Sequence, residues 1–255
     1  MLSYSADKGE EQLKIGVPSR MTYSSKKAGR RNKPTSTRTP KSGDIVVSNH
    51  SSYIDVLYFI SRFDPTFVII DNATLKMQPL RGYAALFAST HPPAALLKAS
   101  VAKSLSEICT EARATNSGPV VVFPENTSSN GKALLSFLPI FSDLGNEDPK
   151  SNLFLFALKY PYKSFCPTYS IGSVFRHLVG LCCQIYNRLV VVQVADDSCP
   201  KFGIESKPGS DEPYDLDEEI RLTITAASRL RSTKLTALDK IDFVKYYNER
   251  QRIYK

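Results

Sequence analysis

The amino-acid sequence predicts an α/β domain with a central, mostly parallel sheet flanked by helices. From residue 44 onwards, short runs of β-branched residues alternate with longer amphipathic stretches, as strands alternate with helices in such a domain. Several of the short runs are apolar at every position, which is typical of strands whose sheet is covered on both faces. The 255 residues suffice for one sizeable core, since single domains usually reach about 250 residues before they divide.

The candidate elements can be placed along the chain from this pattern. Five strands are predicted, at residues 45–48, 66–70, 120–123, 153–159 and 189–194. Four helices are predicted, at residues 53–63, 94–114, 216–231 and 237–252. In the second of these helices, apolar residues recur every three or four positions, so that the helix would lay one apolar stripe on the sheet.

The composition divides the chain into three parts. Residues 1–43 form a basic arm, which we expect to be largely flexible apart from a short strand near residues 13–17. Residues 44–200 hold the α/β domain, and residues 201–255 hold a polar insert and the C-terminal helices. The net charge is +8, and residues 20–41 alone contain eight Lys or Arg and no acidic residue. Such a block either attracts an anionic surface or is simply a solvated loop.

The cysteines and the hydropathy exclude several classes of protein. The five cysteines include no CxxC pair and leave one thiol over, which favours a reducing, cytosol-facing environment. Cys182 and Cys183 have the simple interpretation of buried apolar residues. No stretch reaches the roughly 18 uninterrupted apolar residues of a spanning helix, and no signal peptide is visible. No ligand cluster has the spacing of a metal site, so we expect no metal.

Residues 44–55, with the sequence DIVVSNHSSYID, carry the first candidate site. A strand is predicted to end at His50 and a helix to begin near Ser52, which allows Asp55, one turn into the helix, to face His50. A positioned imidazole that removes a proton from a hydroxyl typically contributes about 10² to 10⁴-fold in rate. A carboxylate behind the ring fixes its tautomer, and with a substrate hydroxyl as nucleophile no serine is needed. The alternative is structural, because Ser52 and Asp55 also match a helix capping box.

Residues 120–137, with the sequence VVVFPENTSSNGKALLSF, carry the second candidate site. A buried strand runs into a Pro-Glu-Asn-Thr turn, and such a turn can present backbone N–H groups and hydroxyls to a phosphate. Asn126 tolerates the left-handed backbone conformation that the turn requires. The alternative is an ordinary exit from a strand into a loop.

Together, these two segments resemble signatures of the glycerolipid acyltransferase family, which includes 1-acylglycerol-3-phosphate and lysophosphatidylcholine acyltransferases. The NHxxxxD signature is matched by Asn49, His50 and Asp55, and the FPEGT signature by Phe123, Pro124, Glu125 and Thr127. Residues 79–82 look like the PxxG element of the family, and residues 154–161 look like its fourth block. The resemblance covers residues 44–196. With its basic terminal helix, the whole chain is most similar to fungal lysophosphatidic acid acyltransferases of the endoplasmic reticulum and lipid droplets.

The resemblance implies a glycerol-3-phosphate acyltransferase-like catalytic domain at residues 44–200 and a direct transfer reaction. His50 would deprotonate a glycerol hydroxyl of a lysophospholipid, most simply lysophosphatidic acid, and that hydroxyl would attack the thioester of acyl-CoA. Asp55 would orient His50. The lysophospholipid would be held by the FPEGT-like segment, Phe123, Pro124, Glu125, Asn126 and Thr127. Acyl-CoA is then a co-substrate, and no cofactor is implied.

The chain departs from the family pattern at three places. Asn126 replaces the Gly of FPEGT, and Asn is one of the few other residues that visit the required conformation. Ser128 and Ser129 stand where many members have Arg after the Thr, so Arg81 or Lys132 is predicted to contact phosphate instead. The family's second signature, which ends in Arg, has no match after residue 82. The TSSNG segment is closer to the lysophosphatidylcholine branch, which leaves the acceptor open.

The expected partners are acyl-CoA, a lysophospholipid and a membrane surface, and the expected location is the cytosolic side of the endoplasmic reticulum membrane and lipid droplets. The basic arm, or an anchor outside the sequence given, would bring the site to the bilayer. One alternative keeps the fold as a weakly active or inactive scaffold in membrane trafficking. Another uses residues 20–41 to bind nucleic acid, but that block has no RNA-binding aromatic signature, so no nucleic-acid partner is expected. His91 and His177 receive no function, and the oligomeric state is not predicted.

Overall fold

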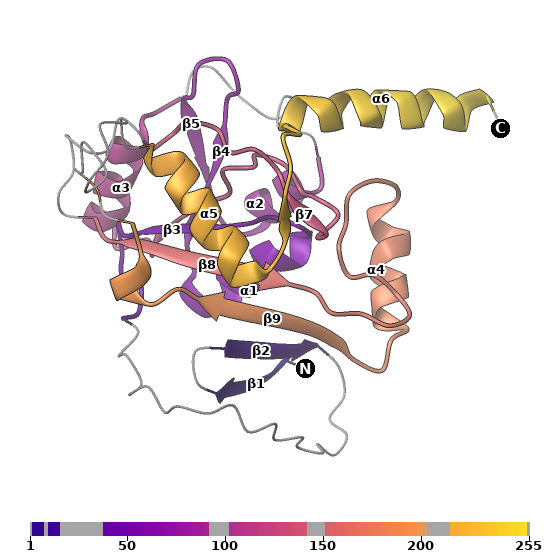
Figure 1. Cartoon of the computed structure of the whole chain (residues 1–255), viewed down its shortest axis with the longest axis horizontal. Helices are drawn as coiled ribbons and strands as arrows, with labels where there is room; N and C mark the ends of the chain where they lie inside the picture. Colours follow the sequence, from indigo (N-terminus) through magenta and orange to yellow (C-terminus); the bar gives the residue numbers. More distant parts are fainter. Residues whose placement is uncertain are drawn as a thin grey trace.

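The computed structural model describes residues 2–7, 10–15, 38–91, 102–141, 151–200, 202 and 215–253. Within these residues, eight strands form one sheet (Figure 1). In spatial order the strands are β1 (Leu2–Asp7), β2 (Glu10–Ile15), β9 (Asn187–Gln193), β8 (Leu153–Lys159), β3 (Ile45–Ser48), β6 (Val120–Val122), β4 (Thr66–Ile70) and β5 (Met77–Leu80). The four strands β8, β3, β6 and β4 are parallel, and the strands on either side of them join antiparallel. The predicted fold class is therefore confirmed.

Helices cover both faces of the parallel strands, and alternate residues of β3 belong to opposite cores. Ile45 and Val47 pack with α3 (Leu105–Ala114) and α5 (Leu216–Ser228). Val46 packs on the other side with α1 (Tyr53–Phe63), α2 (Gly82–Ser89) and α4 (Val174–Cys182). Since the side chains of a strand alternate between faces, an all-apolar strand such as β3 requires this double cover.

The remaining elements lie around the ends of this layered core. The C-terminal helix α6 (Ala237–Ile253) projects from the body of the molecule (Figure 1). It follows a short parallel pair formed by β10 (Arg231–Ser232) and β7 (Ala133–Leu134). A turn of 3-10 helix at Asp196–Ser198 follows β9. No helix within the described ranges is both long enough and apolar enough to cross a membrane.

Three strand predictions and one helix prediction agree with the structure in both bounds, at 45–48, 66–70, 153–159 and 53–63. The strand predicted at 120–123 ends one residue earlier, and that predicted at 189–194 begins two residues earlier. The helix predicted at 216–231 ends at Ser228 because Arg229 turns left-handed, with a φ of 54°. The helix predicted at 237–252 extends to Ile253.

The helix predicted at 94–114 is not continuous, because residues 102–104 are not helical. Residues 92–101 lie outside the described residues, and the helix itself begins at Leu105. Ser104 caps it, since its hydroxyl accepts the N–H of Glu107 and the Glu107 carboxylate accepts the N–H of Ser104. Just before this cap, Lys103 is extended and exchanges two backbone hydrogen bonds with Met77. The apolar spacing in the sequence therefore extends on the N-terminal side of the capping box at which this helix begins.

The N-terminal part adds a hairpin where the sequence predicted only a short strand near residues 13–17. Strands β1 and β2 pair with each other, and β2 extends the sheet beyond β9. The rest of the predicted arm up to residue 37, with most of the basic block, lies outside the described residues. The polar insert at 203–214 lies outside them as well.

Cys182 and Cys183 at the end of α4 correct another expectation. Both are exposed rather than buried. The neighbouring Leu181 is the buried residue of this helix in the core, and Val174 packs against the same core while partly exposed. The pair therefore does not contribute to the core.

Candidate active site

His50 lies directly after β3, at the carboxyl end of the parallel strands. In an open α/β sheet this is the end where ligands usually bind. Asn49 fixes the strand end to β8, because its side-chain amide donates to the carbonyl of Leu158 (2.9 Å) and accepts the N–H of the same residue (2.7 Å). The backbone of His50 is held in turn by the loop after β6, since its N–H donates to Glu125 (2.8 Å) and its carbonyl accepts the N–H of Ser129 (2.8 Å). The imidazole therefore projects from a rigid support.

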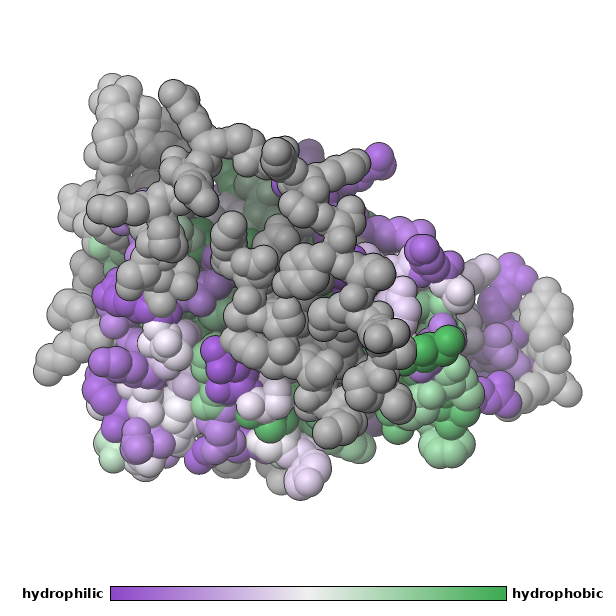
Figure 2. All heavy atoms as spheres, turned by 90° about the horizontal axis from the view of Figure 1, so that it is seen from below, coloured by the Kyte–Doolittle hydropathy of each residue, from purple (hydrophilic) through white to green (hydrophobic). Residues whose placement is uncertain are grey.

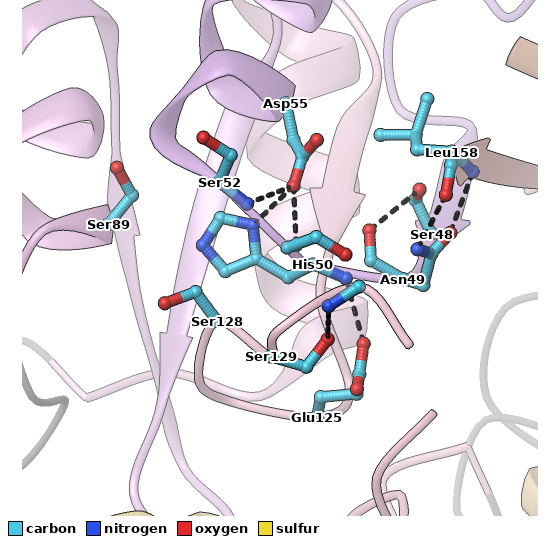
Figure 3. A network of polar contacts seen from close by, with 12 residues as sticks. Ser48, Asn49, His50, Ser52, Asp55, Ser89, Glu125, Ser128, Ser129 and Leu158 are labelled. Atoms are coloured by element: carbon cyan, nitrogen blue, oxygen red, sulfur yellow. Dashed lines mark hydrogen bonds and ion pairs between the residues drawn. The ribbon is translucent and has the colours of Figure 1, made fainter. Parts of the chain in front are cut away.

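Asp55 faces His50 from the first turn of α1. Its Oδ2 lies 3.0 Å from Nδ1 of His50 and also accepts the backbone N–H groups of Ser51 (2.6 Å) and Ser52 (2.8 Å) (Figure 3). The hydroxyl of Tyr160 donates to the other oxygen, Oδ1. Burial and the nearby Asp55 raise the pKa of Tyr160 well above its usual range, which keeps this hydroxyl protonated as a donor. One carboxylate thus caps α1 and also contacts the imidazole, so the capping interpretation does not exclude the catalytic one.

The ring of His50 is fixed from a second side by Phe123. The two rings stack, with their centroids 4.4 Å apart and their planes inclined by 22°. Because Nδ1 is directed at Asp55, Nε2 is the ring nitrogen left on the side away from that carboxylate. Figure 3 shows Ser89 and Ser128 on that side of the ring. Both serines line the same cleft as His50.

The FPEGT-like loop divides into residues that face this cleft and residues that support it. Phe123, Asn126 and Thr127 line the cleft, whereas Pro124 and Glu125 are buried behind it. Glu125 is 1% exposed, and its two carboxyl oxygens accept the N–H groups of His50 and Leu135 (2.9 Å). Burial raises the pKa of Glu125 to about 8. The structure therefore places Glu125 under the histidine and not in a position to grip a substrate.

Asn126 does more than replace a glycine. Its φ of 51° is the left-handed conformation that the turn requires. Its side-chain amide donates to the carbonyl of Ile70 (2.7 Å) and to Asn72 (2.8 Å), and accepts the N–H of Ile70 (3.3 Å). The side chain thereby ties the loop after β6 to the end of β4, which a glycine could not do.

The cleft beside His50 has an empty volume of about 520 Å³, part of it open to solvent. Most of its wall is apolar. The wall is formed by Val56, Phe67, Val68, Ile69, Leu80, Ala85, Ala88 and Phe123. These side chains come from α1, β4, β5, α2 and the loop after β6, so the cleft can hold a hydrocarbon chain next to the imidazole.

A second cavity of about 750 Å³ adjoins this cleft, and Ser89, His91, Thr127 and Ser128 line both. Its far wall is formed by α6, which contributes Lys240. The ammonium of Lys240 donates to the backbone carbonyl of Ser128 and to its hydroxyl oxygen, the latter at 2.8 Å. Burial lowers the pKa of Lys240 to about 8. No sequence motif points to this residue, because its inward position depends on how α6 packs.

The two cations predicted to contact phosphate lie elsewhere. Arg81 forms an exposed ion pair with Asp64 (2.9 Å), and Lys132 is exposed. Neither lines the cleft or the second cavity. His91, which the sequence left without a role, lies where the two cavities meet, and His177 bonds to the hydroxyl of Tyr53 (2.9 Å).

Comparison with known proteins agrees with the predicted family. Residues 26–143 match the family model described as Acyltransferase. The lysophospholipid acyltransferase LPEAT1 of Arabidopsis thaliana is 28% identical over 217 residues, which cover 80% of this chain and 49% of that protein. A candidate lysophosphatidic acid:oleoyl-CoA acyltransferase of Schizosaccharomyces pombe is 28% identical over 203 residues, covering 79% of this chain and 62% of that protein. No solved structure matches significantly. Residues 26–143 are thus similar to acyltransferases, and the chain spans about half to three fifths of the length of these two relatives.

Proposed function

We propose that the protein is an acyl-CoA-dependent O-acyltransferase that esterifies a lysophospholipid, with lysophosphatidic acid as the favoured acceptor and phosphatidic acid as the product. The observation that carries the proposal is the buried His50–Asp55 pair at the wall of a mostly apolar cleft. The names of the relatives support it, since they describe a lysophospholipid acyltransferase and a lysophosphatidic acid:oleoyl-CoA acyltransferase.

His50 acts as the general base in this proposal. Donation from Nδ1–H to Asp55 leaves Nε2 unprotonated, and Nε2 accepts the proton of the acceptor's hydroxyl as its oxygen attacks the thioester carbonyl. The tetrahedral intermediate collapses with cleavage of the C–S bond, and the imidazolium returns its proton to the departing CoA thiolate. The new ester and free CoA are the products, and no covalent enzyme intermediate forms.

The two cavities suit the two kinds of group that the reactants carry. An acyl chain fits the apolar cleft next to His50, where its burial is favourable by about 25 cal/mol per Å². The polar end of the acceptor fits the second cavity, which is lined by Ser, Thr, His and Lys side chains. A hydroxyl brought to the junction of the cavities lies beside His50.

The outer face of α4 supports an approach to a bilayer, where both lipid reactants reside. Phe175 is 74% exposed, and Leu178, Val179, Ile185 and Tyr186 are exposed as well. Figure 2 shows hydrophobic atoms gathered on this side of the molecule, beside the hydrophilic end of α6. Arg176 lies among these residues and Arg188 follows them, and basic side chains near an apolar face suit an anionic leaflet. The surface of the endoplasmic reticulum or of a lipid droplet remains the proposed place of action.

The test is transfer of labelled acyl groups from oleoyl-CoA to a panel of lysophospholipids, with the wild-type protein and His50→Ala compared at equal amounts. The proposal expects transfer by the wild type, highest with lysophosphatidic acid, and a loss of about 10² to 10⁴-fold in the variant. Preference for lysophosphatidylcholine would retain the reaction and change the acceptor. Equal background signals from two folded proteins would favour a noncatalytic scaffold in membrane trafficking.

A further inference from the structure

The second cavity is lined by one face of α6, although this helix is remote in sequence from the histidine. Lys240, Ile241, Val244 and Asn248 are spaced by one, three and four residues, which places them on a single side of the helix. Ser128 is shared by both cavities and lies close to the His50 ring in Figure 3. A ligand group at Lys240 and a reacting group at His50 can therefore belong to one small molecule.

The ammonium of Lys240 faces neutral partners. Two of its three N–H donors are directed at the carbonyl and hydroxyl oxygens of Ser128. The charge of Glu125 affects the pKa of Lys240 electrostatically. The carboxyl oxygens of Glu125, however, accept backbone N–H groups and no bond from the Lys240 ammonium. Burial raises the pKa of Glu125 to about 8, so that it is mostly neutral at pH 7, whereas Lys240, whose pKa burial lowers to about 8, remains mostly charged. A half-buried cation that lines a cavity and has neutral partners gains from an anionic ligand.

We infer that Lys240 binds the phosphate group of the lysophospholipid acceptor, an inference that rests on the proposed function. In lysophosphatidic acid the phosphate is attached to the carbon next to the one that bears the reacting hydroxyl. The phosphates of CoA, by contrast, lie at the far end of the pantetheine arm from the thioester. The short path from Lys240 through Ser128 to the His50 cleft fits the acceptor's phosphate. Lys240 thus takes the role predicted for Arg81 or Lys132.

The kinetic test compares Lys240→Met with Lys245→Met, a matched change on the same helix at an exposed residue that pairs with Asp242 (3.2 Å). The Michaelis constant is measured separately for lysophosphatidic acid, for neutral monoacylglycerol and for oleoyl-CoA. A hydrogen bond to a charged group corresponds to roughly tenfold to hundredfold in affinity. We expect Lys240→Met to raise KM for lysophosphatidic acid by that factor and to leave KM for the other two substrates unchanged. Lys240→Arg, which keeps the charge, recovers part of the loss.

Unchanged KM for lysophosphatidic acid in a folded Lys240→Met protein would overturn the inference. An increase confined to oleoyl-CoA would also overturn it and would assign Lys240 to the phosphates of CoA. If Lys240→Met does not fold, a ligand competition experiment on the wild-type protein decides. Glycerol 3-phosphate should then compete with lysophosphatidic acid while glycerol does not, and equal effects of the two compounds would contradict the inference.

Direct binding separates this inference from the proposed reaction. Equilibrium binding of lysophosphatidic acid to the wild type, Lys240→Met and Lys245→Met requires no acyl transfer. Weaker binding to Lys240→Met alone supports the inference even if no transfer is detected with any acceptor. Equal binding to all three proteins overturns it even if the wild type is an active acyltransferase.

Discussion

The site has two halves that are built in different ways. The reacting half comes from two short segments, residues 49–55 and 123–129, whose polar groups are mostly buried and bonded to one another (Figure 3). The surrounding half comes from α2, α4 and α6, which carry exposed apolar side chains. Helices α2 and α6 meet the first half at the two cavities, and α4 meets it where His177 bonds to Tyr53. Changes in the first half should therefore alter the rate of the reaction or the stability of the fold. Changes in the second should alter the binding of lipid.

The largest effect on stability is expected in the reacting half, at Asn126. Asn126→Ala removes three hydrogen bonds to β4 and Asn72 and places a residue with poor tolerance at a φ of 51°. We expect a loss of about 2 to 4 kcal/mol in the free energy of unfolding, measured by urea denaturation. Asn126→Gly is the matched control, because it loses the same bonds without the backbone strain and should lose about 1 kcal/mol less. Equal losses would show that the backbone conformation is not what Asn126 provides.

In the surrounding half, the double variant Phe175→Ser with Ile185→Ser tests the apolar face near α4. Exposed fractions of 74% and 79% make both side chains available to a bilayer and unimportant for the core. Each buried apolar side chain contributes about 1.5 to 3 kcal/mol, so we expect binding to anionic vesicles to weaken at least tenfold. Phe175→Leu is the control that keeps the face apolar. Unchanged vesicle binding by the double variant would contradict this docking face, and a lowered melting temperature would assign the side chains to the fold.

Glu125→Gln keeps the approximate shape of the buried side chain and removes its titration. Because the amide nitrogen cannot accept one of the two backbone N–H groups, the expected effect is on the pH dependence of the stability and not on its absolute value. Burial raises the pKa of Glu125 from 4.5 to about 8, so the folded state binds one more proton than the unfolded state between these values. This contribution to stability is present below pH 4.5 and is lost as pH rises through about 8. Denaturation at several pH values should show a shallower decline for the variant over this range, most clearly below the pKa of about 8 at which Lys240 also titrates. Parallel profiles would mean that Glu125 is ionised in the folded protein.

The contact between His50 and Asp55 could be predicted from the sequence because it depends on residues that lie close together in the chain. The strand at 45–48, the helix at 53–63 and the spacing of His50 and Asp55 together determine the pair, since one short turn joins the two elements. The same spacing supported a capping box, and only the structure shows that Asp55 both caps the helix and contacts His50. Tyr160 was predicted to lie in a family block but received no role. In the structure its hydroxyl donates to Oδ1 of Asp55.

The surrounding half could not be predicted in the same way because it depends on contacts between distant segments. Ser128 and Lys240 are 112 residues apart and meet only when α6 packs beside the loop after β6. Arg81 and Lys132 lie close in sequence to the expected site but project elsewhere. Glu125 lies in the predicted loop, but its carboxyl group is directed at the backbone N–H groups of His50 and Leu135 and not at the cleft. A sequence motif does not determine the direction of a side chain.

The central claim is that His50 and Asp55 act as one catalytic device, and a double-mutant cycle of acyl transfer tests it most directly. The rate constant for transfer from oleoyl-CoA to lysophosphatidic acid is measured for the wild type, His50→Ala, Asp55→Asn and the double variant, each corrected for its folded fraction. Since Asp55 works through the imidazole, we expect the double variant to be no slower than His50→Ala alone, which loses about 10² to 10⁴-fold. A double variant whose loss equals the product of the two single losses would show independent roles and contradict the account.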